Sequence, residues 1–343
     1  GTKERTMTNA GNKAVKFSIL DLSPVPLGSD VKTALDRSLA LAQHGEALGY
    51  ERFWMAEHHG MEGIASAATA VALSHIGQGT RSIRIGAGGI MLPNHAPMVI
   101  AEQFGTLEAL YPGRVDLGLG RAPGSDQRTA QALRRNLNSD ANEFPRDVLE
   151  LQAFLAGDDR LGIKATPGQG TNIPLYILGS SLFGAQLAAA LGLPYAFASH
   201  FAPQMLDEAL TIYRRDFKPS EQLAEPYVLC GFNIFAADSD EEAEYLSSSM
   251  MQSFVALRTG NPGKMPPPVE GYRESLPPQA QSMLEQILQG SAIGSPDRIK
   301  QGVERFIDRT GADELIISGS IFDQAAREKS YAIAADIRDL IAA

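Results

Sequence analysis

The stretch "RFWMAEHHGM", residues 52–61, ends a short apolar run in an acid and two imidazoles: Glu57, His58 and His59. A buried strand has no structural need for such an ending. A carboxylate beside imidazoles can bind a metal, orient a general base, or act on a bound organic molecule. For any one of these histidines taken alone, a purely structural role stays open.

A metal site requires three or four converging ligands. Glu57 and the histidines at 58, 59, 95 and 200 could supply them, but the first apolar run, "KFSILDLS", adds only Asp21. His58 and His59 would also point opposite ways in a continuing strand. A Ser-His-Asp hydrolase is not indicated, because no G-x-S-x-G elbow is present. The sequence therefore favours an organic ligand, and we predict no metal.

A second constellation suits an anion. "ILGSSLFGAQLAA" reads as a strand, a turn at Gly179, Ser180 and Ser181, and a helix. Backbone N–H groups and hydroxyls at a helix N-terminus form a phosphate site. Arg121, at the end of the strand before it, could pair with the phosphate bidentately. The alternative is that the two serines merely cap the helix.

Glycines concentrate in two adjacent apolar runs, at positions 86, 88, 89, 118 and 120. Side chains are thereby removed, so a flat ligand could lie against bare backbone. Tight sheet curvature without a ligand is the alternative. "GLGRAPG" is not the dinucleotide fingerprint, which needs G-x-G-x-x-G opening a helix.

These residues follow short apolar runs that alternate with amphipathic helical patterns. Near-continuous apolar strands between helices indicate a parallel sheet covered on both faces, and eight such units indicate a closed (β/α)8 TIM barrel with its site at the carboxyl ends of the strands. The predicted strands are 16–23, 52–57, 82–92, 115–122, 174–180, 195–201, 227–237 and 314–318.

We expect one barrel domain over residues 15–343, after a leader or tag at 1–14. A Pro/Gly-rich insertion, residues 259–294, precedes the last helix–strand–helix unit. Its length suggests either a mobile lid or a surface excursion without a role.

Composition narrows the class of protein. The 343 residues carry a formal net charge of −10, which argues against a nucleic-acid partner or an anionic membrane surface. No stretch approaches the roughly 20 apolar residues of a membrane span, and the start lacks a secretory apolar region. The single cysteine, Cys230, fits a reducing compartment, so we expect a cytoplasmic protein.

The segments "FWMAEHH", "GAGGIMLPNHAPMVIAEQFGTLEALYPGRVDLGLGRAPG", "YILGSS" and "GSPDRIKQGVERFIDRTGADELII" resemble the bacterial luciferase-like family of flavin-dependent monooxygenases, over residues 15–340. The resemblance implies a barrel that binds reduced FMN or, in some branches, the deazaflavin F420. It also implies a separate flavin reductase, and O2 that forms a flavin C4a-hydroperoxide to oxidise a small organic substrate.

Carried over by position, the resemblance makes His58 catalytic, with Glu57 or His59 orienting it. Arg121 and the pair Ser180-Ser181 would hold the FMN phosphate, together with Gly179. The family's Glu-Ser pair is Ser-Ser here.

A cis peptide under the flavin ring falls on Gly88-Gly89, and we assign His200, His59 and Asn94 to the substrate pocket. The reactive cysteine of the luciferase site is Gly120 here, so light emission is not implied. Cys230 lies within an apolar run and is expected to be buried packing.

Three other functions stay open: an F420-dependent dehydrogenase or reductase, a flavin-binding relative without turnover, and a metal hydrolase. The family usually dimerises, and the apolar helices at 66–77 and 97–110 are candidates for a homodimer interface, although their apolar faces could simply cover the sheet.

Overall fold

The predicted barrel is present in the computed structural model, which describes residues 14–121, 126–133 and 143–343. The expected leader lies outside the described residues, apart from Ala14. Eight parallel strands close into a ring, because β1 pairs with both β2 and β9 while β7 joins β6 to β9. The ring strands are β1 (Lys16–Asp21), β2 (Arg52–Met55), β3 (Arg84–Met91), β4 (Val115–Gly120), β5 (Leu175–Gly179), β6 (Tyr195–Phe197), β7 (Val228–Ala236) and β9 (Glu314–Ser318). A further strand, β8 (Ser291–Gly294), pairs with β7 outside the ring.

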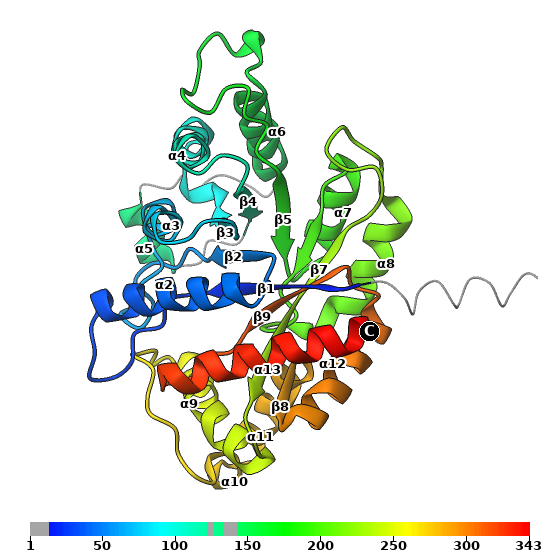
Figure 1. Ribbon diagram of the computed structural model, residues 1–343. Helices are drawn as coiled ribbons and strands as arrows, with labels where there is room; N and C mark the ends of the chain where they lie inside the picture. Colours follow the sequence, from blue (N-terminus) through cyan, green and yellow to red (C-terminus); the bar gives the residue numbers. More distant parts are fainter. Residues whose placement is uncertain (1–13, 122–125, 134–142) are drawn as a thin grey trace, which may run out of the picture.

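Helices surround the ring, and Figure 1 shows the first and the last of the described helices, α2 and α13, side by side along one flank. The His44 imidazole of α2 lies 2.8 Å from the Glu328 carbonyl of α13. The described helices are α2 (Val31–Ala47), α3 (Thr69–Gln78), α4 (Pro97–Leu110), α5 (Gln127–Ala132), α6 (Glu143–Ala156), α7 (Leu182–Leu191), α8 (Leu206–Asp216), α9 (Asp240–Arg258), α10 (Tyr272–Ser275), α11 (Pro278–Ile287), α12 (Pro296–Thr310) and α13 (Gln324–Ala342).

Local signals set the helix ends. Asp30 accepts a hydrogen bond from the Thr33 N–H at 2.8 Å and caps α2. Pro97 occupies the first turn of α4, where a missing N–H costs nothing. Gly192 and Gly311 end α7 and α12 in the left-handed conformation.

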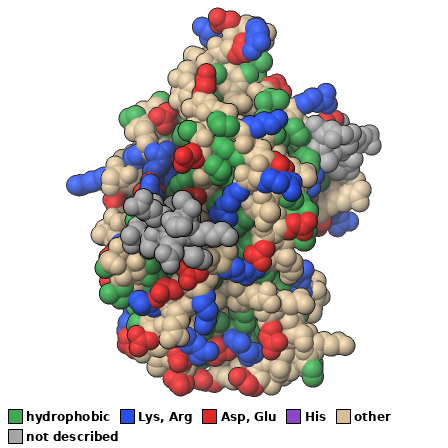
Figure 2. Space-filling view, turned by 90° about the vertical axis from the view of Figure 1, so that its right-hand side faces the viewer, with side chains coloured by type: hydrophobic (Ala, Val, Ile, Leu, Met, Phe, Trp, Pro, Cys, Tyr) green, Lys and Arg blue, Asp and Glu red, His purple; other side chains and the backbone are tan. Residues whose placement is uncertain are grey.

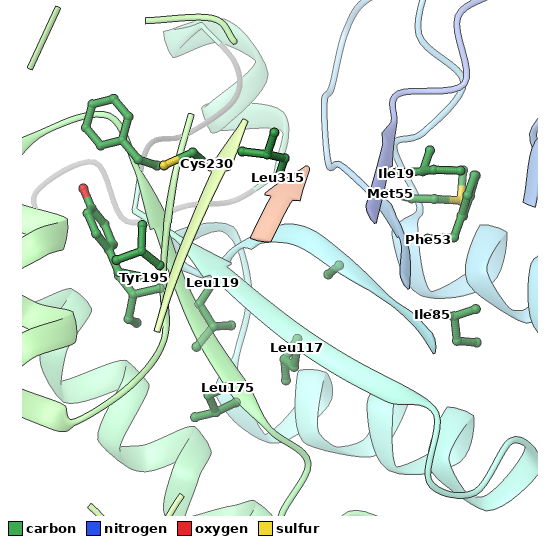
Figure 3. Packing of buried hydrophobic residues seen from close by; sticks show 14 of the residues in the cluster. Ile19, Phe53, Met55, Ile85, Leu117, Leu119, Leu175, Tyr195, Cys230 and Leu315 are labelled. Atoms are coloured by element: carbon green, nitrogen blue, oxygen red, sulfur yellow. The ribbon is translucent and has the colours of Figure 1, made fainter. Parts of the chain in front are cut away.

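Side chains of each strand alternate between two cores. Phe53 and Met55 pack with Ile19 in the layer between strands and helices, as Figure 3 shows. Trp54 and Ala56 belong to a smaller cluster inside the ring. Trp54 and Ala56 therefore face the interior of the ring, a choice that the sequence left undecided.

The expectation of eight strands was one short, because the insertion 259–294 is not irregular throughout. It contains α10, α11 and the short strand β8, which pairs with β7 outside the closed ring. Its first part is tied to the loop after β1: the Met265 N–H donates to Val25 O at 2.9 Å, and the Leu27 N–H donates to Met265 O at 2.7 Å. This part of the insertion therefore lies against the loop after β1.

A buried ion network lies at the amino-terminal ends of the strands and was not predicted. Arg52 donates from Nε to Glu314 at 2.7 Å and from Nη1 to Asp116 at 2.8 Å. Arg84 and the Trp54 indole also donate to Asp116, at 2.7 and 3.1 Å. Because the carboxylates are paired and hydrogen-bonded, their burial is tolerated.

The surface is of mixed charge, and the lone thiol is internal. Lys/Arg and Asp/Glu side chains intermingle on the face in Figure 2. Cys230 is fully buried beside Leu315 (Figure 3), which confirms its expected packing role. Burial raises the pKa of this thiol to about 12. None of the described helices combines the length and apolarity that crossing a membrane would require.

Candidate active site

A cavity of about 1460 Å³ opens at the carboxyl ends of the strands, the end where barrel enzymes carry their sites. Every site residue predicted from the sequence lines it. These residues are Glu57, His58, His59, Gly88, Gly89, Asn94, Arg121, Gly179, Ser180, Ser181 and His200.

Glu57 is a buried hydrogen-bond hub. Its Oε1 accepts from the Met91 N–H at 2.9 Å and lies 2.8 Å from His95 Nε2. Its Oε2 accepts from Asn94 Nδ2 at 3.1 Å and lies 2.5 Å from His59 Nε2. Burial alone would raise the pKa of Glu57, but the hydrogen bonds from His95 and His59 outweigh it and hold that pKa below its ordinary value. The carboxylate therefore joins the loops that follow β2 and β3.

His58 lines the cavity and is not oriented by its neighbours as expected. The hydrogen bonds of Glu57 go to His59 and His95 instead. His58 is held through its backbone, whose N–H donates to Ser66 O at 3.0 Å. Its Nδ1 is buried and has no partner among the described residues. Burial lowers the pKa of His58, so this imidazole is neutral at pH 7 and can accept a proton.

Three of the five glycines serve strand packing. A Cβ on Gly86 would lie 2.6 Å from the Asp116 carbonyl oxygen, and one on Gly118 would lie 2.4 Å from that of Ala87. A Cβ on Gly89 would meet the Gly118 carbonyl at 2.8 Å. The close approach accompanies a register shift between β3 and β4. The curvature alternative thus accounts for these glycines without a ligand.

Gly88 differs because it borders the cavity floor. The Gly88-Gly89 peptide is cis, as expected from the resemblance. A Cβ on Gly88 would lie 2.9 Å from Leu20 Cδ1 and 3.0 Å from Trp54. Both glycines line the cavity, so backbone rather than side chain faces whatever binds there.

The end of β5 and the start of α7 have the chemistry for an anion. Ser181 occupies the N-cap position of α7, but its side chain accepts no capping hydrogen bond. The capping alternative is therefore wrong for this serine. A Cβ on Gly179 would meet nothing within 4 Å. Arg121 reaches the same cavity, with its guanidinium 4.1 Å above the Phe183 ring at the first turn of α7.

The remaining cavity residues include several that the sequence analysis did not assign. His95 was considered only as a metal ligand, although its position shortly after the third apolar run indicated that it would lie at the cavity. Trp54 was treated as strand packing, yet it borders the cavity floor. Gly231 lies beside the His200 ring and had no local signal, because only the fold brings β7 next to β6.

The acids and histidines do not form a metal centre. Among the described residues, no group of three or more His, Cys, Asp or Glu side chains is arranged to hold a metal ion. Asp21 is instead paired with Arg327 at 2.8 Å.

Comparison with known proteins agrees with this geometry. The family model described as luciferase-like monooxygenase matches residues 15–314, so the chain belongs to that family. A luciferase-like monooxygenase of Escherichia coli K12 is 51% identical over 96% of this chain and 98% of its own length. An N-acetyl-S-alkylcysteine monooxygenase of Bacillus subtilis is 30% identical over 94% and 98%. The solved structure of apo-MsnO8 superposes with a TM-score of 0.85 at 32% identity, covering 95% of this chain and 99% of that one.

More distant structures share only the fold. The oxygenating constituent of a 3,6-diketocamphane monooxygenase from Pseudomonas putida, solved with FMN, has a TM-score of 0.70 at 15% identity, covering 94% of this chain and 97% of its own. An F420-dependent tetrahydromethanopterin reductase from Methanopyrus kandleri has a TM-score of 0.67 at 16% identity, with the same coverage. The fold therefore accommodates either cofactor.

Proposed function

We propose that this family member is an FMN-dependent monooxygenase, which takes reduced FMN from a separate reductase and uses O2 to oxidise a small organic molecule. The observation that carries the proposal is one cavity that holds a cationic, helix-tipped anion site and a neutral buried imidazole. Bound reduced flavin would supply the electrons that activate O2.

The residues present fit FMN. Arg121, Ser180, Ser181 and the α7 N-terminus would hold the phosphate, because a helix N-terminus offers N–H donors and arginine adds charge. The bare backbone at Gly88-Gly89 would lie against the flavin ring. The hydroxyl of Ser181 is not committed to capping, which leaves it for the ligand.

Charge favours FMN over F420, the alternative cofactor. The tail of F420 carries several carboxylates and would need several cations. Arg121 is the only Lys or Arg among the described residues that line the cavity, whereas Asp126, Glu143 and Asp147 add negative charge to it. One arginine and a helix N-terminus match a single phosphate.

His58 is the proposed catalytic residue. Its neutral imidazole lines the cavity, where it can take a proton from the substrate or hold one against a developing negative charge. Glu57 acts elsewhere: its four hydrogen bonds fix the loops after β2 and β3 and thereby the cavity wall around the flavin.

FMN binding tests the cofactor site. Trp54 is the only tryptophan and borders the cavity floor, so its fluorescence should fall when FMN binds. Arg121→Ala should weaken FMN by about 10- to 100-fold, the loss of a charge-assisted contact. The exposed Arg81→Ala is the matched control. Equal dissociation constants for Arg121→Ala and Arg81→Ala, or tighter binding of F420 than of FMN, would count against the site.

Turnover tests the chemistry. With reduced FMN supplied and a panel of substrates, oxygenated product should form, and 18O2 should label it. His58→Ala should lower turnover by about 100-fold or more while FMN affinity stays unchanged. The exposed His75→Ala controls for the substitution itself. Full activity of His58→Ala would remove this imidazole from the reaction.

We also propose a homodimer through α3 and α4. Val71, Val99 and Leu110 on these helices expose 74%, 43% and 56% of their surface, and a second copy packed here would remove this apolar surface from water. Val71→Asp should convert the dimer to monomer in sedimentation analysis, whereas Val269→Asp, on the insertion, should not.

A further inference from the structure

The cavity has a second half that the proposed flavin residues do not use. Those residues come from β3, β4, β5 and the segments that follow them. The opposite wall comes from β1, β6, β7, α9 and β9. A pocket for one ligand commonly measures about 300–1,000 Å³, so 1460 Å³ leaves space for a second molecule beside the flavin.

This opposite wall is apolar and uncharged. None of the described lining residues from these five elements and their following loops is Asp, Glu, Lys or Arg; the apolar side chains among them include Leu22, Phe201, Leu257, Pro262 and Ile316. The guanidinium of Arg258 lies 5.0 Å from the Phe254 ring and 5.8 Å from the Phe201 ring, and Arg258 does not line the cavity. A charged ligand would lose its hydration here without gaining a partner.

His200 supplies the polar group of this wall. Its backbone is fastened to β7, because Asn233 Nδ2 donates to His200 O at 2.8 Å and Ser199 Oγ donates to Gly231 O at 2.7 Å. The ring lies against Gly231, where a Cβ would be 2.0 Å from Nδ1. Any larger residue at position 231 would displace the imidazole.

The ring borders the cavity. Nδ1 is buried against Gly231 without a hydrogen-bond partner among the described residues, so Nε2 is the ring nitrogen left for a ligand. Burial lowers the pKa of His200 to about 4, so the imidazole is neutral at pH 7. A neutral imidazole has one N–H donor and one acceptor lone pair. It can therefore recognise one uncharged polar group.

We infer that His200 is a specificity-determining residue, seated by Gly231, which selects an uncharged and mainly apolar substrate with one polar group such as a carbonyl. The inference rests on the proposed function and deepens it. A carboxylate or ammonium of the same size is disfavoured, since the wall offers it no counter-charge.

The test uses three probes of one length: 2-octanone, octanoate and octylammonium. Calorimetry measures their binding to the FMN-loaded protein and to the protein alone. The ketone should bind at least about 10-fold more tightly than either ion. Octanoate or octylammonium binding as tightly as the ketone would overturn the inference. Failure of FMN to bind would instead refute the proposed function. The probe preference would then be measured in the Arg121→Ala variant, whose anion site no longer attracts octanoate, and it would still decide the inference.

Variants at positions 200 and 231 test whether these two residues cause the preference for the ketone. His200→Phe keeps the ring and removes its polar atoms, so 2-octanone should bind about 2- to 10-fold more weakly, the value of one hydrogen bond. Gly231→Ala should act in the same direction by displacing the ring. The exposed His75→Phe is the control, and melting temperatures show that each variant folds. Unchanged ketone affinity in folded His200→Phe would overturn the assignment.

Discussion

Glu57→Gln tests whether the buried hub maintains the active-site wall. Each carboxylate oxygen of Glu57 accepts two hydrogen bonds, one from His95 or His59 and one from Met91 or Asn94. A glutamine has one oxygen and one NH2 group. Whichever way it lies, the NH2 group opposes the N–H of Met91 or Asn94, and the facing imidazole must change its tautomer to accept from it. One or two of the four hydrogen bonds are therefore lost with almost no change in volume.

The expected loss of stability follows from the burial of Glu57 and its neighbours and from the charge of its carboxylate. Hydrogen bonds to a charged group contribute about 1.5–3 kcal/mol each. The two histidines keep 16% and 26% of their side-chain surface exposed, so water replaces part of what they lose. We therefore expect Glu57→Gln to lower the free energy of unfolding by about 2–4 kcal/mol at pH 7. Glu285→Gln, at an exposed position, should change it by less than about 0.5 kcal/mol.

Urea unfolding followed by Trp54 fluorescence measures the difference in unfolding free energy between the parent protein and the variant. Repeating the measurement at several pH values tests whether the charge of Glu57 is the cause. The pKa of Glu57 in the fold lies below its ordinary value of 4.5. Its charged form therefore adds stability that is complete above about pH 4.5 and is lost as the pH falls through the folded value. The difference in unfolding free energy between the parent protein and the Glu57→Gln variant should be full at pH 7 and narrow in acid. A difference under about 1 kcal/mol, or one that widens in acid, would refute the reasoning.

Three further predictions concern the frame around the site. Asp116→Asn should cost about 3–5 kcal/mol in urea unfolding, because Arg52 and Arg84 lose a buried counter-charge; the exposed Asp159→Asn is its control. Cys230 should react with a thiol reagent at pH 8 only after unfolding, because burial raises its pKa to about 12; fast labelling of the folded protein would contradict this. Gly63→Ala should lower stability by about 1–3 kcal/mol, because its Cβ would lie 2.1 Å from the Gly263 carbonyl oxygen, and a melting temperature equal to that of the parent would show that the two loops are free to separate.

The sequence predicted the barrel because apolar strands and capped helices are local patterns. Asp30 before α2 and the glycines after α7 and α12 indicate the helix ends from the sequence alone. The insertion was harder to predict. Its β8 is only four residues long and gains its hydrogen bonds from β7, so no local pattern marks it. Proline-rich sequence also suggested mobility, whereas backbone hydrogen bonds at Met265 tie this segment to the loop after β1.

The sequence predicted where the site residues lie along the strands, but it did not predict which residues they contact. The carboxyl ends of parallel strands meet at one edge, so reading only those positions gathered residues that do line one cavity. Which neighbour Glu57 contacts depends on the loop after β3, which folds back to present Met91 and His95. The glycines at 86 and 118 were misleading as a sign of ligand space, because their need for a missing side chain comes from the adjacent strand and neither lines the cavity.

Strand β2 links the stabilising and reactive ends of the barrel. It begins at Arg52, inside the ion network, and leads to His58 at the cavity. Between them, the Trp54 indole donates to Asp116 below, while its ring lies beside Gly88 at the cavity floor. Loss of the Asp116 charge should therefore reach the floor through Trp54: folded Asp116→Asn should show an altered Trp54 emission maximum and weaker FMN binding, although position 116 does not line the cavity. Wild-type emission and affinity in that variant would show that the two ends of the strand act independently.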